Sequence, residues 1–142
     1  MSAAGGGGWV RAALLAGVVY FLIGRVFALP VSHVQAWRLA AWLLSGCVYA
    51  AHIGYERFGL RTPNRPAALH VAAGVAFGAF ALAVAGMIHS LSTTSAIRPV
   101  WLLAIVLWPA FTALPAFVGA FVAGARLRRV KSRQAGEPGS AG

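Results

Sequence analysis

Four long apolar segments, separated by short stretches rich in polar residues and proline, dominate the pattern of the chain. They run over residues 9–29, 33–58, 66–91 and 99–125. Each is long enough to match the about 20 mostly apolar residues that a helix needs to cross a bilayer. Pro66 and Pro99 open the third and fourth segments, where the first turn of a helix tolerates proline. The pattern therefore predicts four membrane-spanning helices.

The first segment has the shortest uncharged core. Thirteen residues separate Arg11 from Arg25, and they cover about 20 Å of a hydrocarbon core of about 30 Å. Arginine side chains that extend toward the headgroups lengthen the effective span. A cleaved signal peptide is the alternative, but the charged start is weak and no clean cleavage signal follows. We therefore expect a retained helix.

Composition supports an all-α integral membrane protein built as a four-transmembrane-helix bundle. The chain has 142 residues, of which 60% are hydrophobic and 10% charged, and its mean hydropathy is +0.77. Soluble domains carry about 25% charged residues, and disorder requires low hydrophobicity. We expect a disordered Gly-rich start at 1–8, a transmembrane domain at 9–129, and a basic, then Gly-rich, disordered tail at 130–142.

The basic residues are unevenly distributed between the two sides of this topology. Twelve Lys and Arg residues oppose two acids, and they lie between apolar runs, which favours lipid headgroups over nucleic acid. One side carries Arg11, Arg57, Arg61, Arg65, Arg126, Arg128, Arg129, Lys131 and Arg133. The other side carries Arg25, Arg38 and Arg98. The positive-inside rule therefore predicts cytoplasmic termini, a cytoplasmic (inner) cell membrane if the source is bacterial, and contact with anionic headgroups on the cytoplasmic side.

The second segment carries nearly all its polar side chains on one narrow face. At about 100° per residue, Ser45, Tyr49, His52 and Glu56 all fall within about 40° of Arg38. Polar groups in hydrocarbon are costly unless they face partners or water. Two interpretations remain open: structural polar packing between helices, or a water-accessible path through an oligomer.

The deepest polar groups suggest a cluster near the cytoplasmic side. His52 and Glu56 are four residues apart on a helix, so they share a face and can exchange a proton. His70 lies at the same depth if the second and third segments form a hairpin. We expect these three side chains to meet, with Arg57 or Arg61 as a competing partner for Glu56.

The four histidines raise the alternative of a haem or pigment site. An antiparallel hairpin would pair His33 with His89 and His52 with His70, as bis-histidine ligation requires. Nineteen residues separate the two histidines of each helix, which places both pairs at the membrane edges and turns the second side chain by about 100°. We therefore expect no cofactor and no metal site.

Three rows of small residues can support close helix packing. They consist of Gly46, Ala50 and Gly54; Gly74, Gly78 and Gly86; and Ala116, Ala120 and Gly124. In lipid, helices associate through close contact at such residues, either inside one bundle or between copies in a homo-oligomer. Outside the cytoplasmic half, Arg25 and Arg38 have no acidic partner, which indicates headgroup anchoring or an anion site between the first two helices.

No catalytic motif is recognisable, so we do not expect an enzyme. The leading hypothesis is an accessory or structural subunit that acts by interaction within a larger membrane complex. A small oligomeric transporter or channel with a path along the polar face of the second helix is the first alternative. A haem- or pigment-binding membrane subunit is the second. The sequence does not decide among them.

Overall fold

The computed structural model is helical throughout the part it describes, residues 6–94 and 99–135. The helices are α1 (Gly6–Val26), α2 (Val34–Gly54), α3 (Asn64–Thr94) and α4 (Pro99–Ala135). A short π-helical turn, η2 (Tyr55–Gly59), extends α2. The expectations for residues 1–5, Arg98 and 136–142 lie outside the described residues.

Several helix boundaries differ from the predicted ones. α1 begins at Gly6, inside the Gly-rich stretch expected to be disordered, and ends at Val26, short of Leu29. α4 continues through residues 130–135, where we expected the disordered tail to begin. That extension is rich in Arg, Lys and Gln, which form helices readily even outside an apolar environment. The structure thus has helix at 6–8 and at 130–135, where the sequence pattern predicts disorder.

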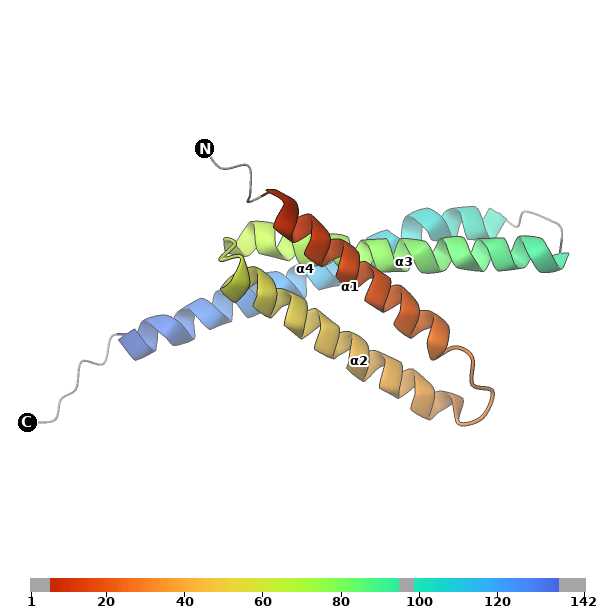
Figure 1. Cartoon of the computed structure of the whole chain (residues 1–142), viewed down its shortest axis with the longest axis horizontal. Helices are drawn as coiled ribbons and strands as arrows, with labels where there is room; N and C mark the ends of the chain where they lie inside the picture. Colours follow the sequence, from red (N-terminus) through yellow and green to blue (C-terminus); the bar gives the residue numbers. More distant parts are fainter. Residues whose placement is uncertain (1–5, 95–98, 136–142) are drawn as a thin grey trace, which may run out of the picture.

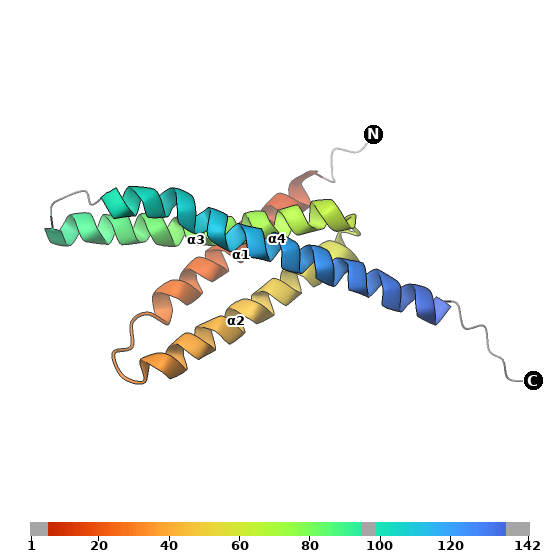
Figure 2. The ribbon, with the colours of Figure 1, turned by 180° about the vertical axis from the view of Figure 1, so that it is seen from behind.

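The four helices form two hairpins that lie at an angle to one another. α3 and α4 run side by side, and α1 packs across α3, as Figures 1 and 2 show from opposite sides. Toward its N-terminal end α2 runs beside α1 and diverges from α3 and α4, which it approaches near η2 (Figure 1). The helix α4 continues through Pro109 and Pro115 and changes direction along its length (Figure 2).

Three of the helices are long and apolar enough to cross a membrane. They are α1 over Gly7–Val26, α3 over Asn64–Thr93 and α4 over Pro99–Arg129. The helix α2 is not among them, because Gln35, Arg38 and His52 lower its mean hydropathy. The predicted membrane character therefore holds for three helices, and the fourth span rests on other arguments.

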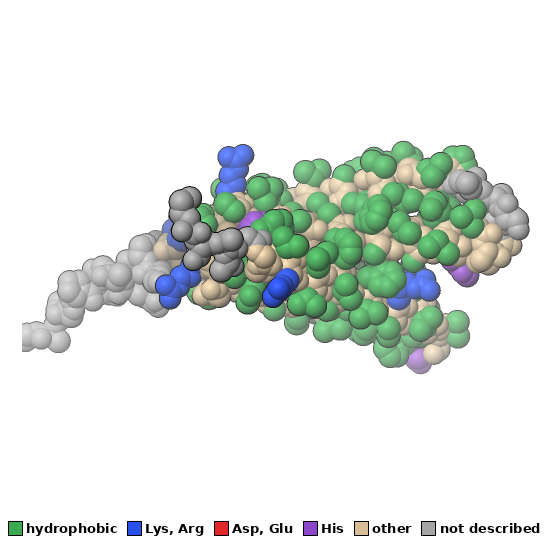
Figure 3. All heavy atoms as spheres, turned by 45° about the horizontal axis from the view of Figure 1, so that its top comes forward, with side chains coloured by type: hydrophobic (Ala, Val, Ile, Leu, Met, Phe, Trp, Pro, Cys, Tyr) green, Lys and Arg blue, Asp and Glu red, His purple; other side chains and the backbone are tan. Residues whose placement is uncertain are grey.

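The surface is apolar and the interior contains polar groups. Hydrophobic side chains cover much of the face seen in Figure 3, and Trp42 on α2 is 79% exposed. A small core of Ile53, Ala68, Val71 and Ala120 forms where the end of α2 meets α3 and α4. A soluble protein of this size seldom exposes so continuous an apolar surface. This distribution suits a protein that is surrounded by lipid.

Candidate functional site

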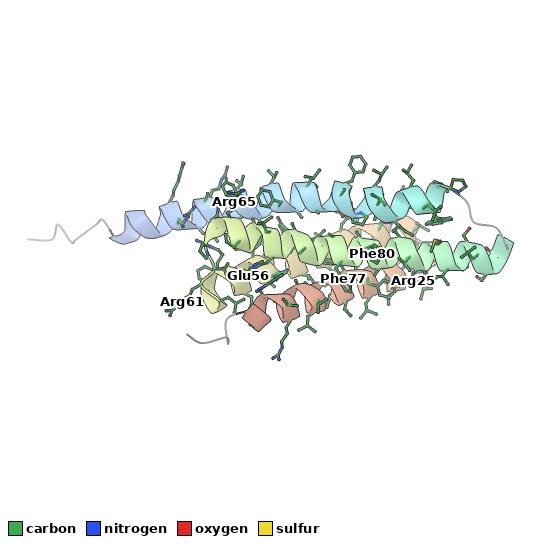
Figure 4. All side chains as sticks on the ribbon, turned by 90° about the horizontal axis from the view of Figure 1, so that it is seen from above. Arg25, Glu56, Arg61, Arg65, Phe77 and Phe80 are labelled. Carbon is green, nitrogen blue, oxygen red and sulfur yellow. The ribbon has the colours of Figure 1, made fainter. Side chains whose placement is uncertain are left out.

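Glu56 lies at the centre of a buried polar cluster. Its side chain is 0% exposed, and its Oε2 lies 3.1 Å from Nδ1 of His70 on α3. Figure 4 shows Glu56 among the helices, whereas Arg61 projects outward. Glu56 is the one acidic residue in the described part of the chain. The sequence-based expectation that Glu56 and His70 lie close together matches this geometry.

The turn that carries Glu56 is held by main-chain and side-chain hydrogen bonds. The Leu60 N–H donates to the Tyr55 carbonyl at 3.0 Å, which closes the π-helical turn. The Thr62 N–H donates to the Glu56 carbonyl at 2.9 Å, and Arg57 Nη1 donates to the Thr62 carbonyl at 3.0 Å. π-helical turns often occur at functional sites because they re-aim the side chains they carry. Arg57 therefore stabilises the turn, and the expectation that it would compete for Glu56 is wrong.

Trp9 covers the cluster from α1. Its ring stacks on His70 with a centroid distance of 4.3 Å and an interplanar angle of 11°. Trp9 is the first residue of the first apolar segment, and nothing in the sequence pattern connects it with His70. That contact depends on how α1 crosses α3, which helical periodicity does not reveal. The sequence does place Trp9 and His70 at a similar depth on the same side of the membrane, and this is the one feature that hints at their contact.

His52 occupies a different position from the one predicted. It is buried, and its Cε1 lies 3.1 Å from the position that a Cβ on Gly74 would take. Among the described residues, neither of its ring nitrogens has a hydrogen-bond partner. The predicted pairing of His52 with Glu56 is thus replaced by a pairing of Glu56 with His70, because η2 turns Glu56 toward α3.

Two further side chains connect the cluster to α4. The Tyr49 hydroxyl donates to the carbonyl of Ala116, and Asn64 Nδ2 donates to the carbonyl of Phe121 at 2.9 Å. Ser45, one turn before Tyr49, is half-buried. Sequence analysis did not identify Asn64, whose position just before Pro66 resembles an ordinary helix start. On the polar face of α2 and η2, Tyr49 and Glu56 therefore bond within the bundle.

The small-residue rows on α3 and α4 serve internal packing. A Cβ on Gly74 would lie 3.1 Å from the Ala13 carbonyl, and a Cβ on Gly78 would lie 3.0 Å from the Gly17 carbonyl. Gly86 is covered by Trp101. On α4, Ala116 and Gly124 meet Tyr49 and Asn64, and Ala120 lies in the core.

The row on α2 differs from the other two rows. A Cβ on Gly46 or Gly54 would meet no described atom within 4 Å, and Ala50 is exposed. Of the two roles expected for these rows, packing inside one bundle is therefore not seen for this row among the described residues. The face that it forms is open.

The outer arginines are separated from the cluster. Figure 4 places Arg25 far along the molecule from Glu56. Arg25 and Arg38 are exposed, and Arg38 borders a hollow of about 240 Å³ together with Phe27 and Pro30. Because Arg25 does not border this hollow, the two arginines do not jointly enclose an anion.

The arrangement does not bring the outer histidine pair together. His33 precedes α2 with φ 52°, and His89 is exposed near the end of α3. The α1–α2 connection and the C-terminal end of α3 lie apart in both Figure 1 and Figure 2. His70 contacts Glu56 instead of facing His52. The alternative of bis-histidine ligation therefore finds no paired geometry at the outer histidines, and at the inner pair the His70 Nδ1 is directed to Glu56.

A groove of about 590 Å³ opens between α1 and α2 beside this cluster. Arg11, His52 and Tyr55 border it together with mostly apolar residues. Comparison with family models, curated proteins and solved structures yields no match for this chain. The function is therefore inferred from the geometry of the chain.

Proposed function

We propose that this protein is a four-span membrane protein that acts as an accessory or structural subunit and docks a partner helix on the open face of α2. The observation that carries the proposal is the contrast between the glycine rows. Gly74 and Gly78 are closed by α1, whereas a Cβ on Gly46 or Gly54 would meet no described atom within 4 Å. A small-residue face is the feature through which helices approach each other closely in lipid.

The dimensions of α2 support a membrane crossing. Its 21 residues cover about 31 Å, which matches a hydrocarbon core of about 30 Å. Arg38 lies near the outer end, where its side chain can reach the headgroups. Tyr49 and Glu56, near the inner end, are held in hydrogen bonds. Because four crossings return the chain to its starting side, the proposal places both termini in the cytoplasm, in agreement with the positive-inside rule.

The hydrogen bonds favour interaction over conduction. The Tyr49 hydroxyl and the Glu56 carboxylate face carbonyl and imidazole groups of the bundle. The walls of the α1–α2 groove are mostly apolar. A path for water or ions needs a continuous series of polar groups that stay free to exchange partners. The transporter or channel alternative would require these bonds to open.

The native cysteine offers a direct test of docking. Cys47 is exposed on α2 and adjoins Gly46. Oxidation of membranes that contain the full chain is expected to give a disulfide-linked dimer if the partner is a second copy. If the partner is another protein, purification in mild detergent is expected to recover it in fixed proportion.

A pair of tryptophan variants controls for nonspecific effects. Ala50→Trp places a bulky ring in the small-residue row, so it should abolish the dimer or the companion protein. Leu44→Trp lies about 120° away around α2 at another exposed position, and it should leave both intact. Equal behaviour of the two variants, or a protein that stays single in both tests, would contradict the proposal.

A further inference from the structure

The α1–α2 groove has the dimensions of a ligand site. Its volume of about 590 Å³ falls within the range of about 300–1,000 Å³ found for small-molecule sites. Its α1 wall extends from Gly8 to Val19, which covers about 16 Å along the helix. An extended hydrocarbon chain fits such a long, narrow space.

The two ends of the groove differ in polarity. Leu15 and Val19 on α1 face Val48 and Ala51 on α2, so most of the length is apolar. Arg11 borders the end that lies near the start of α1. This arrangement suits an amphiphile whose polar head rests near Arg11 and whose apolar chain follows α1.

The charge at this end favours an anion. Among the described residues that border the groove, Arg11 is the one cation, and its guanidinium offers hydrogen-bond donors in a planar fork. Tyr55, which is 49% exposed, provides a hydroxyl donor at the same end. The carboxylate of Glu56 is turned away into the bundle and meets His70. Within residues 6–94 and 99–135, no acidic side chain therefore opposes an anion at Arg11.

We propose that this groove binds an anionic phospholipid of the surrounding bilayer, with its phosphate at Arg11 and Tyr55 and one acyl chain along Leu15 and Val19. His52 forms part of the floor that separates the acyl chain from α3. The inference goes beyond the proposed docking role, and it requires only that the protein be embedded in a membrane.

Native mass spectrometry of the full chain released from detergent micelles tests the head-group contact. Wild-type protein titrated with phosphatidylglycerol should retain one lipid with about tenfold higher affinity than phosphatidylcholine. Arg11→Gln should remove that preference, because the charge-assisted bonds are lost. Arg61→Gln, which removes an exposed arginine that does not border the groove, should preserve it.

A second pair of variants tests the acyl-chain contact. Ala51→Trp fills the groove and should abolish retention of both lipids, whereas Ala50→Trp, on the adjacent face, should leave lipid retention unchanged. Circular dichroism checks that each variant is folded. If Ala51→Trp does not fold, the loss or persistence of lipid preference in Arg11→Gln decides whether the lipid site exists.

Equal wild-type affinity for the two lipids, equal losses in Arg11→Gln and Arg61→Gln, or equal retention in Ala51→Trp and Ala50→Trp would overturn the lipid site. The docking role fails separately, through an unchanged partner in Ala50→Trp. The two proposals can therefore fail independently.

Discussion

Glu56 and His70 belong to different elements, η2 and α3, and meet through a contact of 3.1 Å between Oε2 and Nδ1. The carboxylate is fully buried and the imidazole is 19% exposed. The pair therefore ties the end of α2 to the start of α3 at a point where the chain reverses direction. A buried polar pair of this kind is costly to break, because the remaining group stays without its partner.

Removal of either partner should destabilise the fold and should do so non-additively. Glu56→Ala or His70→Ala is expected to lower the free energy of unfolding in detergent by about 1–3 kcal/mol. The loss of unfolding free energy in the double variant should be smaller than the sum of the two single losses by about 0.5–3 kcal/mol, since each single variant already removes the contact.

Denaturant unfolding of the four proteins, followed by circular dichroism, measures this coupling. Glu56→Gln serves as the conservative control, because its amide can still bond to the imidazole. Strictly additive effects in the double variant would show that the two residues act separately.

The two glycines Gly78 and Gly46 should respond oppositely to alanine. A Cβ on Gly78 would lie 2.7 Å from the Cβ of Tyr20, so Gly78→Ala should destabilise the protein by about 1–3 kcal/mol. A Cβ on Gly46 meets no described atom within 4 Å, and alanine favours helix, so Gly46→Ala should be neutral or slightly stabilising. Thermal unfolding of the isolated chain in detergent compares them. A larger loss of thermal stability in Gly46→Ala than in Gly78→Ala would refute the packing described for α1, α2 and α3.

The bond from Tyr49 to α4 should be measurable by removal of one oxygen. Tyr49→Phe keeps the ring but loses the donor to the Ala116 carbonyl. It should therefore lower the free energy of unfolding by about 0.5–1.5 kcal/mol. Tyr55→Phe is the matched control, because Tyr55 is half exposed. This substitution should change the free energy of unfolding only slightly. Chemical unfolding in detergent provides both values, and equal losses would argue against the Tyr49 contact.

The sequence predicted the helical class and the positions of the long segments because apolar length is a local property. It also predicted the meeting of Glu56 with His70, since a hairpin places both at one depth. It did not predict the contact of Trp9 with His70 or the bond from Asn64 to Phe121. Both depend on how helices cross, and this is set by close approach at residues such as Gly74.

The lack of a hydrogen bond from His52 to Glu56, among the described residues, has a different cause. The prediction assumed a regular α-helix up to Phe58, whereas the α-helical part ends at Gly54 and a π-helical turn follows. The wider turn directs Glu56 toward α3. The bonds that close this turn lie within residues 55–62, where the Leu60 N–H donates to the Tyr55 carbonyl and the Thr62 N–H donates to the Glu56 carbonyl.

Cysteine accessibility tests the proposed four-span topology most directly. In a Cys47→Ser background, single cysteines replace Val31, which is 95% exposed between α1 and α2, and Arg61, which is exposed between α2 and α3. If α2 crosses the membrane, a membrane-impermeant maleimide should label Val31→Cys in intact spheroplasts, and Arg61→Cys after the membrane is opened. Labelling of both positions from the same side would contradict the crossing of α2 and the topology built on it.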